Sequence, residues 1–173
     1  MTTREIGKIV EQSYGHYYSP QTISVITKQL DEKVKEYHSR KITKDYAVVY
    51  TDSTYISVKR GTVGKEALHI LIGITISGEK EILSYELFPT ESPENYKDML
   101  EDFKKRGLNK VLLFVTDRLK GIKKKEQFPN ERSLNRYVCV SACEYNVKYA
   151  GISHYGFSMV KEELENMIEE IYI

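Results

Sequence analysis

The chain has 173 residues, of which 40% are hydrophobic and 29% charged, and this fits one globular domain with a small accessory unit. Its formal net charge of +1 excludes a global field that would draw it onto DNA or a membrane, so any nucleic-acid surface must be a local patch. The longest apolar run, residues 67–76, is too short to span a bilayer, and the N-terminus has no apolar signal core, so no membrane association and a cytoplasmic location are expected.

Residues 1–40 predict a helical unit. A short amphipathic helix is expected at 3–14, followed by a second helix from Ser19, its N-cap, to about residue 37. This pair resembles a helix-turn-helix, in which the first turn of the second helix contacts DNA. Gln21, Thr22 and Ser24 are the candidate contact residues. An ordinary helical hairpin with a polar first turn is the alternative.

A polar linker at 39–45 leads to a region with strand-like periodicity. Strands are predicted at 46–59, 66–76 and 80–88, with turns around 61–64 and 77–79, which together make an antiparallel meander. A helix follows at 93–106, with Ser92 as its N-cap and Gly107 at its end. The next strand is expected at 110–116.

The pattern is weaker after residue 117. Residues 118–136 are polar, with a short helix expected at 119–125, and then a strand at 136–141 and a helix from about 142. Cys139 and Cys143 lie four residues apart with no second pair, which favours buried free thiols over a zinc site. Residues 158–173 predict an amphipathic helix with an acidic outer face, whose apolar side must be buried on the sheet or on a second copy.

The predicted order, β-β-β-α-β-α-β-α, is typical of an α/β ribonuclease H-like mixed sheet, in which three antiparallel strands precede alternating helices and strands. We therefore expect such a unit over residues 46–150, preceded by the helical unit 1–40 and followed by the C-terminal helix 158–173. In this fold the first and fourth strands are neighbours.

Asp52 and Asp117 are the candidate catalytic and metal-binding residues. Each lies in or just after an apolar strand, where a carboxylate costs free energy unless it is hydrogen-bonded or binds a cation. Two carboxylates on neighbouring strands suit a hard divalent ion and phosphoryl-transfer chemistry. Aspartates that only cap a turn or a helix are the alternative. The basic run after Asp117 either contacts DNA phosphates or is a solvated loop; it contains Arg118, Lys120, Lys123 and Lys124.

The order and spacing of several short motifs resemble the mutator-type transposases of bacterial insertion sequences. The motifs are Met1-Thr-Thr-Arg-Glu-Ile, Tyr14-Gly15, Ser19-Pro-Gln-Thr-Ile-Ser24, Val49-Tyr-Thr-Asp52, Leu71-Ile-Gly-Ile74, Gly78-Glu-Lys-Glu-Ile-Leu83, Lys105-Arg-Gly-Leu108, Thr116-Asp-Arg-Leu-Lys-Gly-Ile122, Phe128-Pro-Asn130 and the segment 146–149. The resemblance covers almost the whole chain.

The resemblance implies that Asp52 and Asp117 are the first two of three acids that hold Mg²⁺ or Mn²⁺. It implies DNA transposition and recombination by metal-dependent phosphodiester cleavage and strand transfer. The implied partners are double-stranded DNA at the terminal repeats of the element, and a second copy of the chain or a full-length transposase.

Three departures qualify this expectation. Arg118 stands where such proteins usually have glycine, Ala142 replaces an expected histidine, and the third acid lies beyond Ile173 in the family. Glu162, Glu163 and Glu165 on the tail are not assigned that role, because an acidic helix face is usually solvated. We therefore expect a transposase whose activity is incomplete in this chain. A DNA-binding remnant or regulator without catalysis and a metal-dependent nuclease with its third carboxylate elsewhere are the alternatives.

Overall fold

The computed structural model describes residue 8, residues 11–12, and residues 15–60, 62–89, 92–116, 127–128 and 130–172. Its elements are α2 (Pro20–Ser39), β1 (Tyr46–Arg60), β2 (Thr62–Thr75), β3 (Lys80–Phe88), α3 (Pro93–Arg106), β4 (Val111–Thr116), β5 (Gln127–Phe128), α4 (Glu131–Tyr149), the 3₁₀ helix η1 (Phe157–Met159) and α5 (Lys161–Tyr172). None of the described helices has the length and apolar character to cross a membrane.

The strands form one mixed sheet in the order β3-β2-β1-β4, and the short β5 pairs with β1 beyond β4. β1 pairs antiparallel with β2, and β2 pairs antiparallel with β3. β4 and β5 both run parallel to β1. Three antiparallel strands with the fourth strand parallel to the first confirm the predicted ribonuclease H-like mixed sheet.

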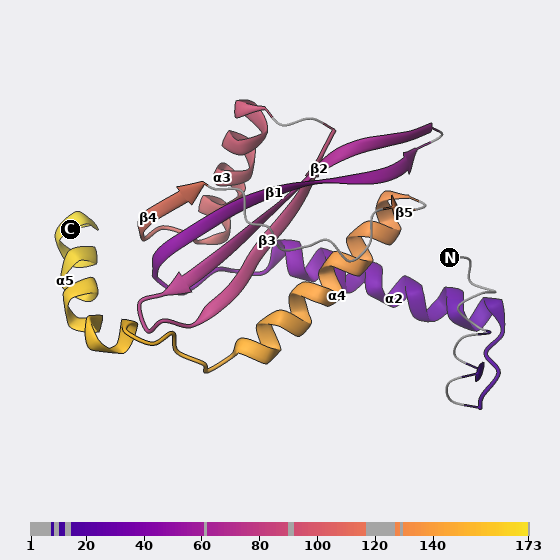
Figure 1. Cartoon of the computed structure of the whole chain (residues 1–173), viewed down its shortest axis with the longest axis horizontal. Coiled ribbons are helices and arrows are strands. Elements are labelled where there is room, and N and C mark those ends of the chain that lie inside the picture. The colour runs from indigo at the N-terminus through magenta and orange to yellow at the C-terminus, as the bar shows by residue number, and fades with distance from the viewer. Residues whose placement is uncertain are drawn as a thin grey trace.

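Helices cover both faces of the sheet (Figure 1). On one face, α2 and α4 bury a core that includes Leu68, Ile70 and Leu134. On the other face, α3 buries Leu71 and Phe103 within a second core. Leu68 and Ile70 therefore share a face, and their neighbour Leu71 points to the opposite one, as the alternation of a strand requires.

Capping residues set the helix boundaries as predicted. The Ser19 hydroxyl accepts a hydrogen bond from the Thr22 backbone at 3.1 Å, and the Ser92 hydroxyl accepts one from the Asn95 backbone at 3.2 Å. Gly107 ends α3 with a φ of 108°, a conformation that favours glycine. The predicted helix at 3–14 lies mostly outside the described residues, and the predicted helix at 119–125 lies wholly outside them.

The predicted strand at 136–141 is wrong, because these residues belong to α4. The run Tyr-Val-Cys-Val has high β-propensity, but the buried positions Leu134, Val138 and Ala142 recur every four residues and form one side of a helix. Asn130 caps this helix by accepting a hydrogen bond from the Ser133 backbone at 2.8 Å. The predicted turn at 61–64 is also too long, since β2 begins at Thr62.

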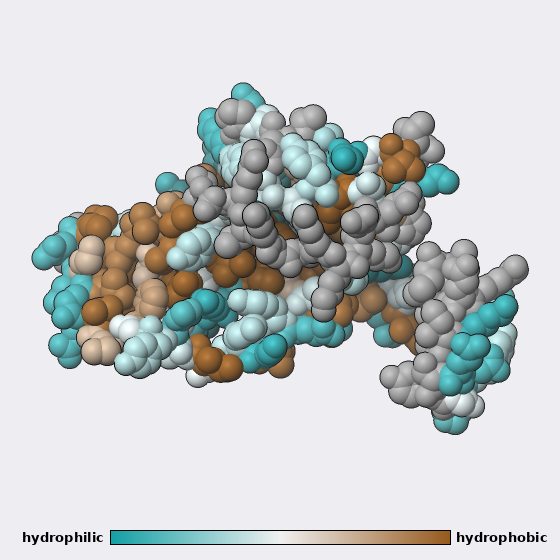
Figure 2. Space-filling view, viewed as in Figure 1, coloured by the Kyte–Doolittle hydropathy of each residue, from teal (hydrophilic) through white to brown (hydrophobic). Residues whose placement is uncertain are grey.

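The tail helix α5 lies beside β4, where the Tyr172 hydroxyl donates to the Val111 carbonyl at 2.8 Å and accepts from its N–H at 3.1 Å. Only part of its apolar side is buried, because Ile168 is 2% exposed while Met167 is 47% exposed and Ile171 59%. Figure 2 shows apolar residues gathered at this end of the molecule.

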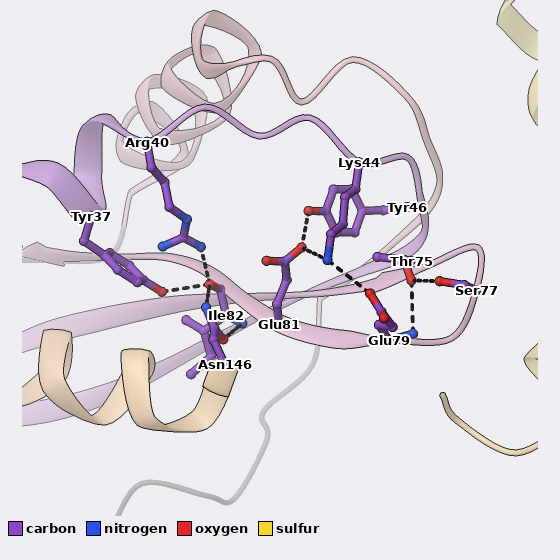
Figure 3. Close-up of polar contacts among 10 residues, drawn as sticks. All are labelled: Tyr37, Arg40, Lys44, Tyr46, Thr75, Ser77, Glu79, Glu81, Ile82 and Asn146. Atoms are coloured by element: carbon purple, nitrogen blue, oxygen red, sulfur yellow. Dashed lines mark hydrogen bonds and ion pairs between the residues drawn. The ribbon is translucent and has the colours of Figure 1, made fainter. Parts of the chain in front are cut away.

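The Ile82 peptide joins α2, the linker and α4 to the sheet (Figure 3). Its carbonyl accepts from the Tyr37 hydroxyl at 2.7 Å, from the Arg40 guanidinium, and from Asn146 Nδ2 at 3.0 Å. Its N–H donates to Asn146 Oδ1 at 2.6 Å. Nearby, Glu81 accepts from the Tyr46 hydroxyl at 2.6 Å, and Lys44 pairs with Glu81 and Glu79.

Asn146→Ala is expected to lower the free energy of unfolding by about 1–3 kcal/mol, because it removes both bonds from the edge of the sheet and leaves the Ile82 N–H without its acceptor. Urea denaturation measures this loss. Asn166→Ala, the same change at an exposed site in α5, serves as the control and should cost less than about 0.5 kcal/mol. Equal losses would contradict the role assigned to Asn146.

A second link between α2 and α4 is the ion pair of Asp31 with Arg136, whose Nε and Nη2 lie 2.8 and 2.9 Å from the carboxylate oxygens. These hydrogen bonds, helped by the charges of Arg136, Arg132 and Lys35, hold the pKa of Asp31 below its ordinary value of 3.8. A lowered folded-state pKa stabilises the protein above the unfolded value, and that stabilisation is lost as the pH falls through the folded value.

Asp31→Asn should therefore cost on the order of 1 kcal/mol at neutral pH, since the pair is partly exposed. The difference from wild type should vanish as the pH falls below 3.8 and through the lowered value. Thermal unfolding of both proteins across this range measures it, and Glu32→Gln on the same helix is the control. A difference that persists unchanged in acid would show that Asp31 stabilises the protein without its charge.

Candidate metal centre

Asp52 lies on β1, in the middle of the sheet. Its cross-strand partner on β2 is Ile70, which is 4% exposed and belongs to the core under α2 and α4. Cross-strand partners point to the same face, so the partly buried Asp52 side chain also points to that face. A carboxylate in such surroundings requires a hydrogen bond or a cation to offset its desolvation.

β4 brings the second candidate strand to this point. It runs parallel to β1, and the register ends at the pair Thr51 and Thr116. The next residue on β1 is Asp52, and the next residue in the sequence after β4 is Asp117. Asp117 lies outside the described residues, so the approach of the two carboxylates stays a prediction, whereas the adjacency of their strands is confirmed.

The chemistry of Asp52 suits the metal that the resemblance implies. Carboxylate oxygens are the hard ligands that Mg²⁺ and Mn²⁺ prefer, and Asp52 carries such a group at the point where the β4 pairing ends. Across the part of the chain that the structure describes, which does not include Asp117, no group of three or more histidine, cysteine, aspartate or glutamate residues could hold an ion.

The acidic residues of the tail lie away from Asp52. Glu162, Glu163 and Glu165 are exposed on α5, and Tyr172 of this helix bonds to Val111. Val111 is the first residue of β4, and Asp52 lies beyond its last residue. The separation of the two strand ends is about 16 Å at the usual rise of about 3.3 Å per residue. This arrangement agrees with leaving these glutamates out of the site.

Two other sets of candidate ligands are structural. His69 is 1% exposed on the α3 face, where its ring lies 4.8 Å from that of Tyr96 and 5.4 Å from that of Phe88, as expected of a core histidine. Cys139 and Cys143 are free thiols in α4. Cys139 is buried, which raises its pKa to about 11, but Cys143 is exposed, so the prediction of two buried thiols is wrong for Cys143.

The candidate DNA-contacting residues fall into two groups. Gln21 and Thr22 are exposed and Ser24 is half-buried in the first turn of α2, at the end that extends beyond the sheet (Figure 1). The Thr22 hydroxyl also lies 2.9 Å from the hydroxyl of the N-cap Ser19, so it supports the start of the helix. The second group lies outside the described residues; it consists of Arg118, Lys120, Lys123 and Lys124.

The proteins to which the chain is similar in sequence include transposases for bacterial insertion sequence elements. The chain is 44% identical over 122 residues to the transposase for insertion sequence element IS905 of Lactococcus lactis subsp. lactis, which covers 70% of this chain and 31% of that protein. It is 42% identical over 123 residues to the transposase for IS1201 of Lactobacillus helveticus, which covers 71% of this chain and 33% of that protein. The chain thus spans about a third of the length of these relatives.

A weaker likeness is to the crystal structure of the catalytic domain of Mos1 mariner transposase, with a TM-score of 0.29 and 14% identity over 89% of this chain and 84% of that one. The fold assignment above rests on the strand order and not on this likeness.

The family described as "Transposase, Mutator family" matches residues 1–131, a range that contains α2, the four principal strands and both candidate aspartates. This match covers most of the chain, and the chain belongs to the Mutator family of transposases.

Proposed function

We propose that the chain takes part in DNA transposition as a unit of an insertion-element transposase that binds element-end DNA. In this proposal Asp52 and Asp117 hold Mg²⁺ or Mn²⁺ for phosphodiester cleavage and strand transfer. The observation that carries it is the parallel register of β1 and β4, which ends at Thr51 and Thr116, one residue before each aspartate. Family membership supports the same reading.

The roles of the protein groups follow from their chemistry. When bound, divalent ions stabilise the negative charge that develops on phosphoryl oxygens. Asp52 would supply a carboxylate fixed by a central strand, which costs little reorganisation, and Asp117 would supply a second from the neighbouring strand. The exposed first turn of α2, with Gln21 and Thr22, would contact the DNA, and the basic run 118–124 would contact phosphates.

The proposal also includes the binding partners of the chain and its location in the cell. The DNA would be the terminal repeats of an insertion element, and the protein partner would be a second copy or a full-length transposase. We propose that the chain acts in the cytoplasm, where bacterial DNA lies.

The alternative is a regulator that binds element ends without cutting them. It is favoured by the exposed first turn of α2, because DNA contact there does not require the metal centre. Gel shift of the chain with element-end duplex, followed by a nicking assay on the same DNA with and without Mg²⁺, separates the two. Binding with Mg²⁺-dependent nicking supports the transposase, binding without nicking supports the regulator, and the absence of binding contradicts both.

A further inference from the structure

β1 and β2 continue as a two-stranded ribbon beyond the rest of the sheet (Figure 1). The pairing of β3 with β2 ends at Ala67 and Phe88, whereas β1 and β2 stay paired as far as Arg60 and Thr62. The predicted strand at 46–59 already includes the β1 side of this extension. The predicted strand at 66–76 leaves out its β2 side, residues 62–65, because the two glycines at 61 and 64 were assigned to one long turn.

One face of the ribbon is anchored. Ile56 is 5% exposed and Val58 1%, and both belong to the core that contains Phe128 and Leu134. β5 also pairs with β1 at Ser57 and Val58. A two-stranded ribbon alone is marginally stable in water, so this packing by β5 and α4 is what holds the ribbon in place.

The opposite face is open and basic. Tyr55 is 57% exposed, and Lys59 and Lys65 are exposed beside it. In the register, Lys59 pairs with Val63 and Lys65 pairs with Ser57, so the two lysines are diagonal neighbours on one face. Diagonal neighbours have Cα atoms roughly 7–8 Å apart.

Among the described residues of the ribbon, none on this face is acidic. Glu66, the acidic residue of the ribbon, pairs with Ile56 on the anchored face and is 7% exposed. Neither Lys59 nor Lys65 forms an ion pair with any residue of the described ranges. The ribbon thus holds two solvated ammonium groups, those of Lys59 and Lys65, at a fixed spacing. This arrangement suits a polyanion whose negative charges are regularly spaced.

We infer that the open face of the β1–β2 ribbon binds the phosphate backbone of duplex DNA through Lys59 and Lys65. This inference rests on the proposed function. Asp52 points to the opposite face, since its partner is Ile70, so the lysines contact duplex that flanks the cleaved bond and not the reacting phosphate. Such contacts fix the position of DNA without reading its sequence.

The test measures the affinity of the full chain for a labelled mixed-sequence duplex at several KCl concentrations. Each phosphate contact contributes about 0.9 to the slope of log K against log salt. The double variant Lys59→Ala, Lys65→Ala should therefore bind more weakly, with a slope lower by about 1.8. Lys59→Arg, Lys65→Arg should keep the wild-type slope, because arginine also contacts phosphate.

The matched control is Lys148→Ala, Lys161→Ala, which removes two exposed lysines from α4 and α5 and should leave the slope unchanged. An unchanged melting temperature shows that each variant is folded. If wild type binds and the Lys59, Lys65 double variant keeps the wild-type slope, or if the control loses as much, the ribbon inference is overturned and the proposed function stands. If wild type binds no duplex at any salt concentration, both are overturned.

Discussion

Asp52→Asn is expected to abolish the stabilisation of the protein by Mn²⁺ or Mg²⁺. An ion that binds only the folded state stabilises it by about 2.7 kcal/mol at a concentration 100 times its dissociation constant. Asparagine keeps the shape of the side chain and removes the charge that attracts the ion. The melting temperature of wild type should rise with added Mn²⁺, and that of the variant should not.

Asp52→Asn also has an expected effect on the stability of the metal-free protein. Two carboxylates held close together repel each other, so removal of one charge should leave the metal-free protein equally stable or more stable. If Asp52 instead served only to cap a turn, Asp52→Asn would destabilise the protein whether or not metal is present. Asp45→Asn, at an exposed position just before β1, is the matched control and should respond to Mn²⁺ as wild type does.

Nicking of DNA should depend on the same metal site. Where the wild-type chain nicks element-end DNA with Mg²⁺, Asp52→Asn should reduce the rate on the order of 10²-fold or more, as the loss of one electrostatic stabiliser of a transition state typically does. Equal nicking by the two proteins would show that Asp52 is not part of the site.

Arg106→Ala is expected to be the most destabilising of the substitutions considered, by about 3–5 kcal/mol, because it leaves several buried acceptors without their donor and each such loss costs about 1–3 kcal/mol. The Arg106 residue is 8% exposed, and its guanidinium donates to the carbonyls of Arg40, Tyr37 and Leu83 and to the Ser84 hydroxyl at 3.1–3.4 Å. It thereby joins the end of α3 to the end of α2 and to β3. Burial lowers the pKa of Arg106, and Asp102, 3.6 Å away, acts in the opposite direction.

Urea denaturation of Arg106→Ala, Arg106→Lys and Lys105→Ala tests this role. Lysine cannot reproduce the planar fork of donors, so Arg106→Lys should also be clearly destabilised. Lys105 is exposed on the same turn, so Lys105→Ala should change stability by less than about 0.5 kcal/mol. A loss for Arg106→Ala no larger than that for Lys105→Ala would contradict the network.

The sheet and most helices were predictable because their signals are local. Ser19 and Ser92 mark helix starts through their hydroxyls, and the apolar strand patterns give the first four strands nearly as observed. The first part of α4 was predicted as a strand because its residues have high β-propensity, although its apolar residues recur every four positions. The packing of Leu134 and Val138 against the rest of the protein favours the helix. The β2 side of the ribbon, residues 62–65, was missed because a glycine inside a strand suggests a turn.

The candidate site was predictable only in part. Strand order placed Asp52 beside β4, but β1 carries buried apolar residues on both faces, Val49 on one and Ile56 on the other, so its pattern leaves the face of Asp52 open. The pairing of Asp52 with Ile70 identifies that face. The motif Lys105-Arg-Gly-Leu108, which contributed to the family resemblance, is structural here. Arg106 bridges three elements, and a Cβ on Gly107 would lie 2.5 Å from the Ile42 carbonyl oxygen.

The central claim is that Asp52 and Asp117 together hold a divalent ion. A crystal structure of the full chain grown with Mn²⁺, with anomalous scattering to locate the metal, tests it most directly. The account predicts a manganese peak with an oxygen of each aspartate at roughly 2.0–2.6 Å, the range of hard-cation ligands. Carboxylates more than about 8 Å apart on opposite faces of the sheet, with no metal between them, would contradict it.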